Sequence, residues 1–379
     1  MKQKLIIMLL FKDIVHDNRV IKEINSLAEL GYQIVLFCLR NYDEIPSFPN
    51  DVTIYRFNIT NNIKKSAVKI FFDIYKAIRF YYYIKKSLSN IYKKYDYIVC
   101  HAHDLNTLPF AYMLTKRFKL NKLVYDSHEI FIEMDGRRKV EKILGSLVER
   151  YCVKRVDHMI TVSKPIQEYF KKIYPNKEIT VIRNVPYLTE INNHDNQYFR
   201  EKYCLPSDSA ILIYVGGITR NRGLEQILQA VHVLPKNYVL IFMGYGNMVD
   251  QIKSLARQMQ ITDRLFFHEP VTQDKMLKII SSADVGLLLY QNSCLNNYLA
   301  LPNKLFEYIQ AELPVVASNF PAISELAIGQ LCSPDDPVQI AESIRMAFTI
   351  DEKSNILNAK KQLNWDTEQQ KLKAIYEGV

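Results

Sequence analysis

The sequence contains few cysteines, and none of them stands in a pattern that would bring them together. Its 379 residues include six cysteines, and the closest pair, Cys294 and Cys332, is 38 positions apart. Structural zinc sites and the disulfide frameworks of secreted domains need closely spaced cysteines. We therefore expect neither, and this use of cysteine is typical of a protein that works in a reducing compartment such as the cytoplasm.

Long hydrophobic runs are also absent. The opening apolar run, Leu5–Phe11, lies between Lys4 and Lys12 and is far shorter than the roughly 20 residues of a membrane-spanning helix. Because no small-residue cleavage site follows it, the pattern favours a buried strand over a signal peptide. With 11 glycines and 14 prolines, the composition also excludes a fibrous or low-complexity chain.

What the sequence does contain is enough hydrophobic residues for two cores. At 379 residues and 48% hydrophobic content, it exceeds what a single core usually serves. In both halves, apolar runs suited to buried parallel strands alternate with helical patterns. The predicted strands are residues 5–11, 33–39, 96–101, 122–126 and 158–162, then 210–215, 238–243, 264–267, 285–289 and 315–317.

This alternation predicts an α/β fold of two Rossmann-like, doubly wound domains that face a central cleft. We expect an N-terminal domain over residues 1–188, a polar linker over 189–209 and a C-terminal domain over 210–355. Residues 356–379 are expected to form a C-terminal helix that crosses back to the first domain. Ligands of such sheets bind beyond the carboxyl ends of the strands, so the strand-to-helix loops are the places to look for chemistry.

Two of these loops in the second half are rich in glycine. After strand 210–215, Gly216 and Gly217 permit close approach of the backbone to a ligand, and Arg220 and Arg222 can bind phosphate oxygens. A plain turn with two solvated arginines is the alternative. Gly244 follows the next strand in an incomplete dinucleotide fingerprint, which fits a plain turn equally well.

A short helix further on is also suited to binding an anion. The sequence predicts that it begins at Pro302 and stops before Pro314. Asn303 and Lys304 lie at its N-terminus, which attracts negative charge, and Glu307 lies one turn further on. A diphosphate beside Lys304 and a ribose diol beside Glu307 would fit this arrangement. The alternative is a solvated helix face with a Lys–Glu pair.

In the first half, three polar clusters end three predicted strands. They are residues 13–19, 101–104 and 126–129. Such side chains could form the wall of an active site, hold a general base, bind a metal or simply satisfy one another. A metal is the weakest of these interpretations, because no cluster has the internal spacing of a ligand set.

The positive charge is concentrated in residues 63–94, where nine cations against Asp73 alone give +8 of the total +9. Apolar positions near helical spacing, among them Ile74, Ile78 and Leu88, accompany eight aromatic residues. One interpretation is a pair of helices that pack on the first sheet and present a solvated basic face. The other is an interfacial segment that lies on an anionic membrane surface.

Together, these motifs resemble those of the retaining glycosyltransferases with the GT-B fold, specifically family four, also called group 1. Residues 301–318 are similar to the signature helix and following strand of that family, and residues 216–223 to its phosphate loop. Residues 17–20 and 125–129 and the pair Trp365–Asp366 also resemble family motifs.

The resemblance implies roles for individual residues. Glu307 matches the second glutamate of the family's E-x7-E pair, whereas Leu299 stands in the place of the first, so the usual carboxylate contact to the donor sugar is missing. The implied donor-binding residues are Gly216, Gly217, Arg220, Arg222, Gly244, His268, Asn303, Lys304 and Glu307. The implied catalytic residues are His103, Arg222 and Lys304, and the acceptor-side residues are Asp17, Arg19, Asp126, His128 and Glu129.

The resemblance also implies an activity. The expected reaction is transfer of a sugar from a nucleoside diphosphate donor, of UDP type, to a lipid-linked or oligosaccharide acceptor in cell-surface polysaccharide biosynthesis. We expect no cofactor, no metal and no nucleic acid partner, and a cytoplasmic protein that is peripheral on the inner face of the membrane through residues 63–94. The alternatives are a nucleotide-sugar epimerase or hydrolase of the same fold, and a nucleic-acid-binding protein that uses the basic segment.

Overall fold

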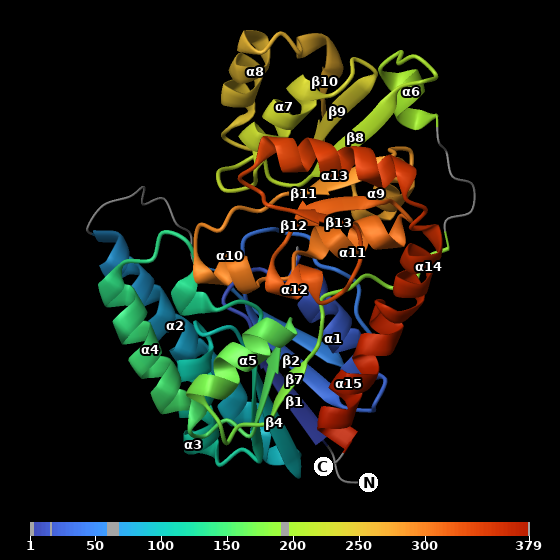
Figure 1. Ribbon diagram of the computed structural model, residues 1–379. Coiled ribbons are helices and arrows are strands. Elements are labelled where there is room, and N and C mark those ends of the chain that lie inside the picture. The colour runs from blue at the N-terminus through green and yellow to red at the C-terminus, as the bar shows by residue number, and fades with distance from the viewer. Residues whose placement is uncertain (1–3, 16, 59–67, 191–196, 378–379) are drawn as a thin grey trace. The chain divides into compact units, whose positions relative to one another are not determined.

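The computed structural model describes residues 4–15, 17–58, 68–190 and 197–377 (Figure 1). The chain divides into two compact units: Met1–Arg183 together with Gln369–Val379, and Asn184–Glu368. The division falls just after the last strand of the first sheet. The described part of 189–209, expected to be a linker, belongs to the second unit and includes α6 (Tyr198–Lys202).

The first unit is built on a parallel sheet with the strand order β3-β2-β1-β4-β5-β6-β7. Its interior strand β1 reads KLIIML and is almost completely buried, because parallel strands are covered on both faces. Its strands are β1 (Lys4–Leu9), β2 (Gln33–Arg40), β3 (Val52–Asn58), β4 (Tyr97–His103), β5 (Lys122–Ser127), β6 (His158–Thr161) and β7 (Ile179–Val181).

The helices of the first unit cover this sheet. They are α1 (Asn18–Ala28), α2 (Val68–Ile91), α3 (Leu108–Phe118), α4 (Lys139–Val153) and α5 (Lys164–Ile173), with the short turns η1 (Tyr92–Lys94) and η2 (Phe131–Glu133). None of the helices among the residues that the structure describes combines the length and the hydropathy that a membrane span requires.

The described part of the basic segment, residues 68–94, forms one long helix, α2, followed by the turn η1, whereas one of our two interpretations was a pair of helices. Phe80, Ile84 and Leu88 point inward, whereas Ile74 and Ile78, which the predicted stripe placed with Leu88, are exposed. The reason is aromatic packing: the Phe80 ring meets Phe11 at 5.3 Å and Phe110 at 6.1 Å, which fixes the face of α2 that is buried.

The second unit has the same architecture. Its sheet is parallel, in the order β10-β9-β8-β11-β12-β13. The strands are β8 (Ala210–Val215), β9 (Tyr238–Met243), β10 (Leu265–His268), β11 (Val285–Leu288), β12 (Val315–Ser318) and β13 (Gln330–Cys332). The helices are α7 (Leu224–Val233), α8 (Val249–Gln258), α9 (Gln273–Ile280), α10 (Leu295–Leu299), α11 (Asn303–Gln310), α12 (Pro321–Ser324), α13 (Pro337–Thr349) and α14 (Lys353–Gln362), with the turn η3 (Thr262–Arg264).

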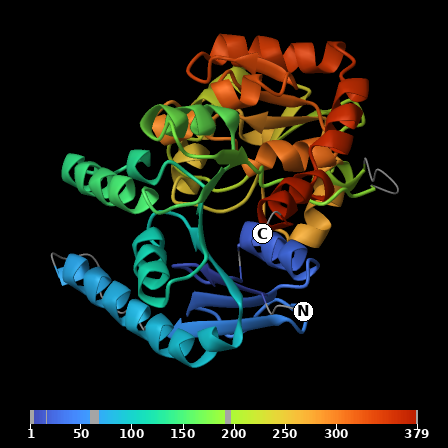
Figure 2. The ribbon, with the colours of Figure 1, turned by 90° about the horizontal axis from the view of Figure 1, so that it is seen from below.

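The last helix, α15 (Trp365–Glu377), contributes residues to both units. At its start the buried Trp365 donates its backbone N–H to the carbonyl of Pro186, at 2.8 Å, in the second unit. Its second half lies along α1 of the first unit (Figures 1 and 2), where Lys373 pairs with Glu29 at 2.7 Å. We predicted that residues 356–379 form a C-terminal helix that crosses back to the first domain. In the structure this segment contains the end of α14 and the whole of α15.

Candidate active site

In each sheet the direction of winding reverses at one place, and ligands of doubly wound folds bind there. The reversal falls between β1 and β4 in the first unit and between β8 and β11 in the second. Asp17 follows β1, His103 ends β4, the loop of residues 216–223 follows β8, and the remaining predicted residues lie at the ends of neighbouring strands or in α1 and α11. The topology therefore gathers the predicted residues at the carboxyl edge of their own sheet.

In the second unit, glycines let the loop after β8 pack closely against its neighbours. A Cβ atom on Gly244 would lie 1.9 Å from the carbonyl oxygen of Gly216, and one on Gly223 would lie 2.1 Å from that of Leu289. Gly216 itself has a φ of 141°. Gly244, which we predicted to bind the donor, therefore lets the end of β9 pack directly against the backbone at Gly216.

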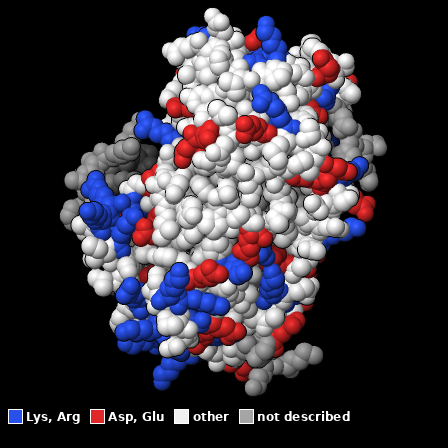
Figure 3. Space-filling view, in the orientation of Figure 1, with Lys and Arg blue, Asp and Glu red and all other residues white. Residues whose placement is uncertain are grey.

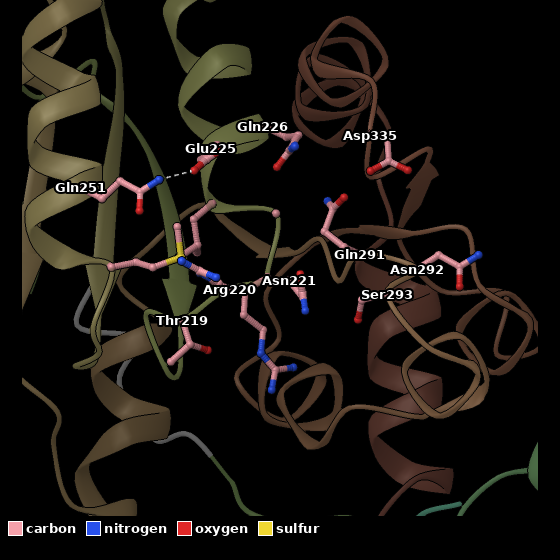
Figure 4. Close-up of a pocket in the computed structure, with 14 residues that line it drawn as sticks. Thr219, Arg220, Asn221, Glu225, Gln226, Gln251, Gln291, Asn292, Ser293 and Asp335 are labelled. Carbon is pink, nitrogen blue, oxygen red and sulfur yellow. Dashed lines mark hydrogen bonds between the residues drawn. The ribbon is translucent and has the colours of Figure 1, made fainter. Parts of the chain in front are cut away.

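The arginines of this loop line a polar pocket of about 460 Å³. Arg222 lies with its guanidinium 4.1 Å from the ring centre of Tyr290, which holds the cation over an aromatic face. Arg220 is exposed. The backbone N–H of Gln291 donates to Asn221 at 3.1 Å and so ties the loop to the segment after β11. Figure 4 shows polar side chains around this pocket, including the hydrogen bond of 2.7 Å from Gln251 to Glu225.

The N-terminus of α11 lies against the same loop. Asn303 is the first helical residue, and Lys304 bonds Glu307 at 2.6 Å. A Cβ atom on Gly216 would lie 4.0 Å from Cε of Lys304, so the lysine stem reaches the start of the loop. The structure therefore brings Gly216, Lys304 and Glu307 together within one unit.

The buried Tyr308 fixes the position of α11. Its hydroxyl accepts from the backbone N–H of Val215 at 3.0 Å and lies 3.3 Å from the carbonyls of Ile213 and Leu287. Its ring fills the space that a side chain at position 286 would take, since a Cβ atom on Gly286 would meet it at 2.8 Å. Sequence reasoning missed Tyr308, although the glycine in an otherwise apolar strand signals such a close approach.

Two other predicted positions offer less to a ligand. Both ring nitrogens of His268 are engaged, one at 2.6 Å from the carbonyl of Glu269 and the other at 2.9 Å from the Tyr198 hydroxyl. The backbone of this loop, rather than the His268 side chain, is therefore the group that could contact the base of a nucleotide. Leu299 is the last residue of α10, and its aliphatic side chain cannot accept a hydrogen bond from a sugar hydroxyl.

In the first unit, the predicted acceptor-side residues form a buried cluster around Arg19. Its guanidinium binds both carboxylate oxygens of Asp126 at 2.8 Å, lies 3.0 Å from Glu23 and donates to the carbonyl of Ile182 at 2.7 Å. His128 bonds the same Asp126 at 2.9 Å. This bidentate geometry is the strong form of an arginine–carboxylate pair, and it brings the ends of α1, β5 and β7 together.

His103 lies beneath His128. Its Nδ1 is 3.3 Å from Nε2 of His128, and the side chain is fully buried. It stacks on His101, which bonds the hydroxyl of Tyr376 at 2.7 Å. We predicted that His103 lies near the transferred sugar; in this structure its buried side chain contacts His128. His128 is the more accessible imidazole of the two.

Asp17 and Glu129 flank this cluster. Asp17 caps α1 through the backbone N–H of Val20 and pairs with Lys12 at 2.8 Å, while Glu129 is exposed. Sequence reasoning missed Glu23 and Tyr376. The spacing of four between Arg19 and Glu23 within one helix could have revealed the glutamate, but no local pattern links Tyr376 to a strand 275 positions away.

Four side chains of the cluster are close enough together to bind a metal ion, but the charges already present argue against a metal site. Glu23, His101, His103 and Asp126 each place one ligand atom within 4.8 Å of the others. However, the Arg19 guanidinium already binds both carboxylates, so a fixed cation stands where a metal would supply positive charge. We interpret the group as an arginine-centred cluster.

Charges in this cluster shift the pKa values of its members. Burial alone would raise the pKa of Asp126, but Arg19 and His128 hold it well below its ordinary value. Burial, followed by the charge of Asp126, raises the pKa of Glu23 to about 8. Burial alone would lower the pKa of His128, but the charges of Asp104 and Asp126 outweigh burial and raise this pKa to about 9. His128 is therefore an imidazolium at neutral pH.

The charge of His128 makes stability depend on pH. A pKa of about 9 in the folded state, against 6.5 unfolded, gives stabilisation that is complete below pH 6.5 and is lost as the pH rises to 9. At about 1.4 kcal/mol per pH unit this amounts to at most about 3.5 kcal/mol. We expect the free energy of urea unfolding to fall over this range more steeply than in His128→Gln. The exposed His232→Gln variant is the control, and equal slopes in the wild type and His128→Gln would contradict the assignment.

Comparisons with known protein families agree with this architecture. Residues 195–363 match the family "Glycosyl transferases group 1". Residues 18–185 match "Glycosyltransferase Family 4". The two matches together take in the second sheet and, apart from β1, the first sheet.

Individual relatives are distant. An uncharacterised glycosyltransferase of Methanocaldococcus jannaschii is 27% identical over 176 residues, which is 44% of either protein. A chitobiosyldiphosphodolichol beta-mannosyltransferase of Debaryomyces hansenii is 20% identical over 86% of this chain and 74% of its own length.

Solved structures extend the likeness in fold over the whole chain. A sucrose-phosphate synthase of Thermosynechococcus elongatus has a TM-score of 0.79 at 17% identity and covers 100% of this chain and 99% of its own. Anabaena HepE, solved in complex with UDP, has a TM-score of 0.75 at 13% identity and covers 100% of both chains.

Proposed function

We propose that this chain, which belongs to the group 1 glycosyltransferases of the GT-B fold, transfers sugar from a UDP-type donor to a lipid-linked acceptor. The observation that carries the donor assignment is the contact between the glycine loop at Gly216 and Lys304 at the winding reversal of the second sheet. Arg222 belongs to the same loop. Cations and a helix N-terminus at that place suit a diphosphate.

We propose the retaining course of reaction that the resemblance to the family implies. The bond between the sugar and the diphosphate breaks, and its electron pair goes to the phosphate oxygen. The acceptor oxygen bonds to the sugar on the same face, with retention of configuration, and the departing phosphate takes the acceptor proton. Lys304, Arg222 and the N-terminus of α11 stabilise the negative charge that develops on that phosphate.

Glu307 suits a different task. Its carboxylate lies one turn into α11 and is paired with Lys304, so it is placed to accept hydrogen bonds from the ribose diol of a nucleotide beside that lysine. Such a contact exists before and during the reaction, and it therefore contributes to donor affinity rather than to the rate. In the first unit, His128 and Glu129 are the residues that we assign to the acceptor.

A lipid-linked acceptor is supported by one relative. The Debaryomyces hansenii enzyme, aligned over 86% of this chain, is named for chitobiosyldiphosphodolichol, a sugar carried on a lipid diphosphate. Assembly of a cell-surface polysaccharide on a lipid carrier would use a reaction of this class. We place the enzyme on the cytoplasmic side of the membrane, where nucleotide sugars are available.

A panel of labelled nucleotide sugars tests this proposal. UDP and GDP sugars are first scored for hydrolysis and then for transfer to polyprenyl-diphosphate-linked sugars, with and without EDTA. We expect one UDP-type donor to label the lipid fraction, to be turned over slowly without acceptor, and to be unaffected by the chelator. Conversion into an isomeric nucleotide sugar, or turnover that ignores the acceptor, would instead identify an epimerase or a hydrolase of this fold.

A further inference from the structure

Helix α4 has the reverse of the usual amphipathic orientation. Its large apolar side chains recur with helical spacing on one face, and that face is turned to solvent. They are 42 to 65% exposed and comprise Val140, Ile143, Leu144, Leu147, Val148 and Tyr151. A surface helix normally buries such a stripe, and contiguous exposed apolar side chains are typical of an interaction site.

The inner face of α4 explains why the helix cannot turn this stripe inward. Glu149 is buried and accepts from the hydroxyls of Tyr125 at 2.8 Å and Tyr174 at 3.1 Å. At Gly145 the backbone approaches η2 so closely that a Cβ atom would lie 2.8 Å from Ile132. Two specific contacts therefore hold α4 in this orientation, and rotating the stripe inward would break both.

Helix α2 adds to the same apolar surface. Its exposed side chains Ile74, Ile78 and Tyr82 recur every four residues, so they too form a stripe. Helix α3 connects the two, since Phe110 stacks on Tyr81 of α2 and Tyr112 meets Tyr151 of α4. We refer to the exposed apolar residues of α2 and α4 as the apolar face.

Cations surround the apolar face. Residues 137–155 hold seven arginines and lysines against two carboxylates, of which Glu149 is buried. In residues 72–94 there are six cations against Asp73. Figure 3 shows Lys and Arg side chains gathered on this side of the first unit with uncharged side chains among them. The surface thus combines apolar side chains with positive charge.

We propose that the apolar face docks on a bilayer that contains anionic phospholipid. Its apolar side chains would lie at the depth of the headgroups, and its cations would face lipid phosphates. A second copy of this chain is a poorer occupant, because a twofold contact sets each patch against itself and would oppose cation to cation. Nucleic acid offers charge but nothing apolar for the stripe of α4.

The inference deepens the proposed function, because docking would hold the enzyme beside an acceptor anchored in lipid. Binding to vesicles needs neither donor nor acceptor. Failure of docking would therefore leave glycosyl transfer intact as a proposal, and failure of transfer would leave docking intact.

Sedimentation with vesicles tests the inference. We expect the protein to bind vesicles of 30% phosphatidylglycerol in phosphatidylcholine, at least about tenfold more weakly at 0.5 M than at 0.05 M salt. Pure phosphatidylcholine vesicles should bind less. Ile143→Ser with Leu147→Ser should lower the partition coefficient about tenfold, since both side chains enter the interface.

Matched variants separate docking from loss of structure. Val233→Ser with Val338→Ser changes two exposed apolar residues of the second unit and should bind vesicles like the wild type. Lys86→Glu with Lys139→Glu should weaken binding at low salt only. Equal sedimentation of the Ile143/Leu147 variant and the wild type would overturn the inference. If the wild type fails to bind vesicles, two further results would also overturn the inference. One is a dimer of the wild type that the Ile143/Leu147 substitutions dissociate, and the other is salt-sensitive binding to duplex DNA.

Discussion

Lys304→Ala and Arg222→Ala are each expected to lower the rate of sugar transfer by about 10²–10³-fold while the fold stays intact. Both cations are assigned to the charge that develops on the departing phosphate, and loss of one group that stabilises such charge has this scale. The chemistry needs a fixed positive charge at this place. Its effect should appear in kcat, measured with the donor that the panel identifies.

Three comparisons sharpen this test. Lys353→Ala and Arg257→Ala remove exposed cations elsewhere in the second unit and should leave transfer unchanged. Glu307→Gln should raise the KM for the donor with little change in kcat, because a ribose contact is made equally before and during the reaction. Rates near that of the wild type in both Lys304→Ala and Arg222→Ala would remove the phosphate assignment.

Most of the fold could be predicted from the sequence because its central strands are buried on both faces. Runs such as LIIML in β1 and AILIYV in β8 carry that signal in one short segment. The strands that were missed are β3, β7 and β13. β3 reads VTIYRFN at a sheet edge and is only partly buried, and the other two are three residues long. Such strands exist because a neighbour pairs with them, and a single sequence does not carry that information.

The candidate site also has one part that the sequence predicted and one part that it did not. Lys304 and Glu307 are one helical turn apart, so local spacing was enough to place them on one side of α11. The Arg19 cluster was only partly foreseen. Its members come from α1, β4, β5 and α15, and the pairing of Arg19 with Asp126 spans 107 positions. Contacts of this range depend on the order of strands in the sheet, which the sequence pattern does not specify.

The periodicity of apolar residues was also not enough to predict which face of α2 is buried. Apolar and aromatic residues occur on several sides of this helix, so more than one stripe satisfies helical spacing. Packing of Phe80 on Phe11 and Phe110 decides among them and leaves Ile74 and Ile78 exposed. The outward stripe of α4 is the complementary case, because Gly145 and Glu149 fix its orientation through contacts distant in sequence.

The second large effect is expected in stability. Arg19→Met should lower the free energy of unfolding by about 3–5 kcal/mol at pH 8, since it removes the guanidinium that pairs with the buried carboxylates of Asp126 and Glu23. The side chains of all three are at most 2% exposed, so water cannot replace the guanidinium. Arg40→Met, which breaks the exposed pair with Asp43, should cost less than about 1 kcal/mol. Urea unfolding of the three proteins gives these values.

The pH dependence distinguishes a lost cation from lost packing. Arg19 is one of the groups that hold the pKa of Asp126 low, so its loss raises that pKa, and the folded variant takes up the additional proton at a higher pH than the wild type does. The gap between wild type and Arg19→Met should therefore narrow from pH 8 to pH 5. Adding Asp126→Asn should recover part of the loss at pH 8, because it removes one of the two buried carboxylates that Arg19 pairs with. A gap that is independent of pH, with no recovery in the double variant, would mean that Arg19 acts through packing alone.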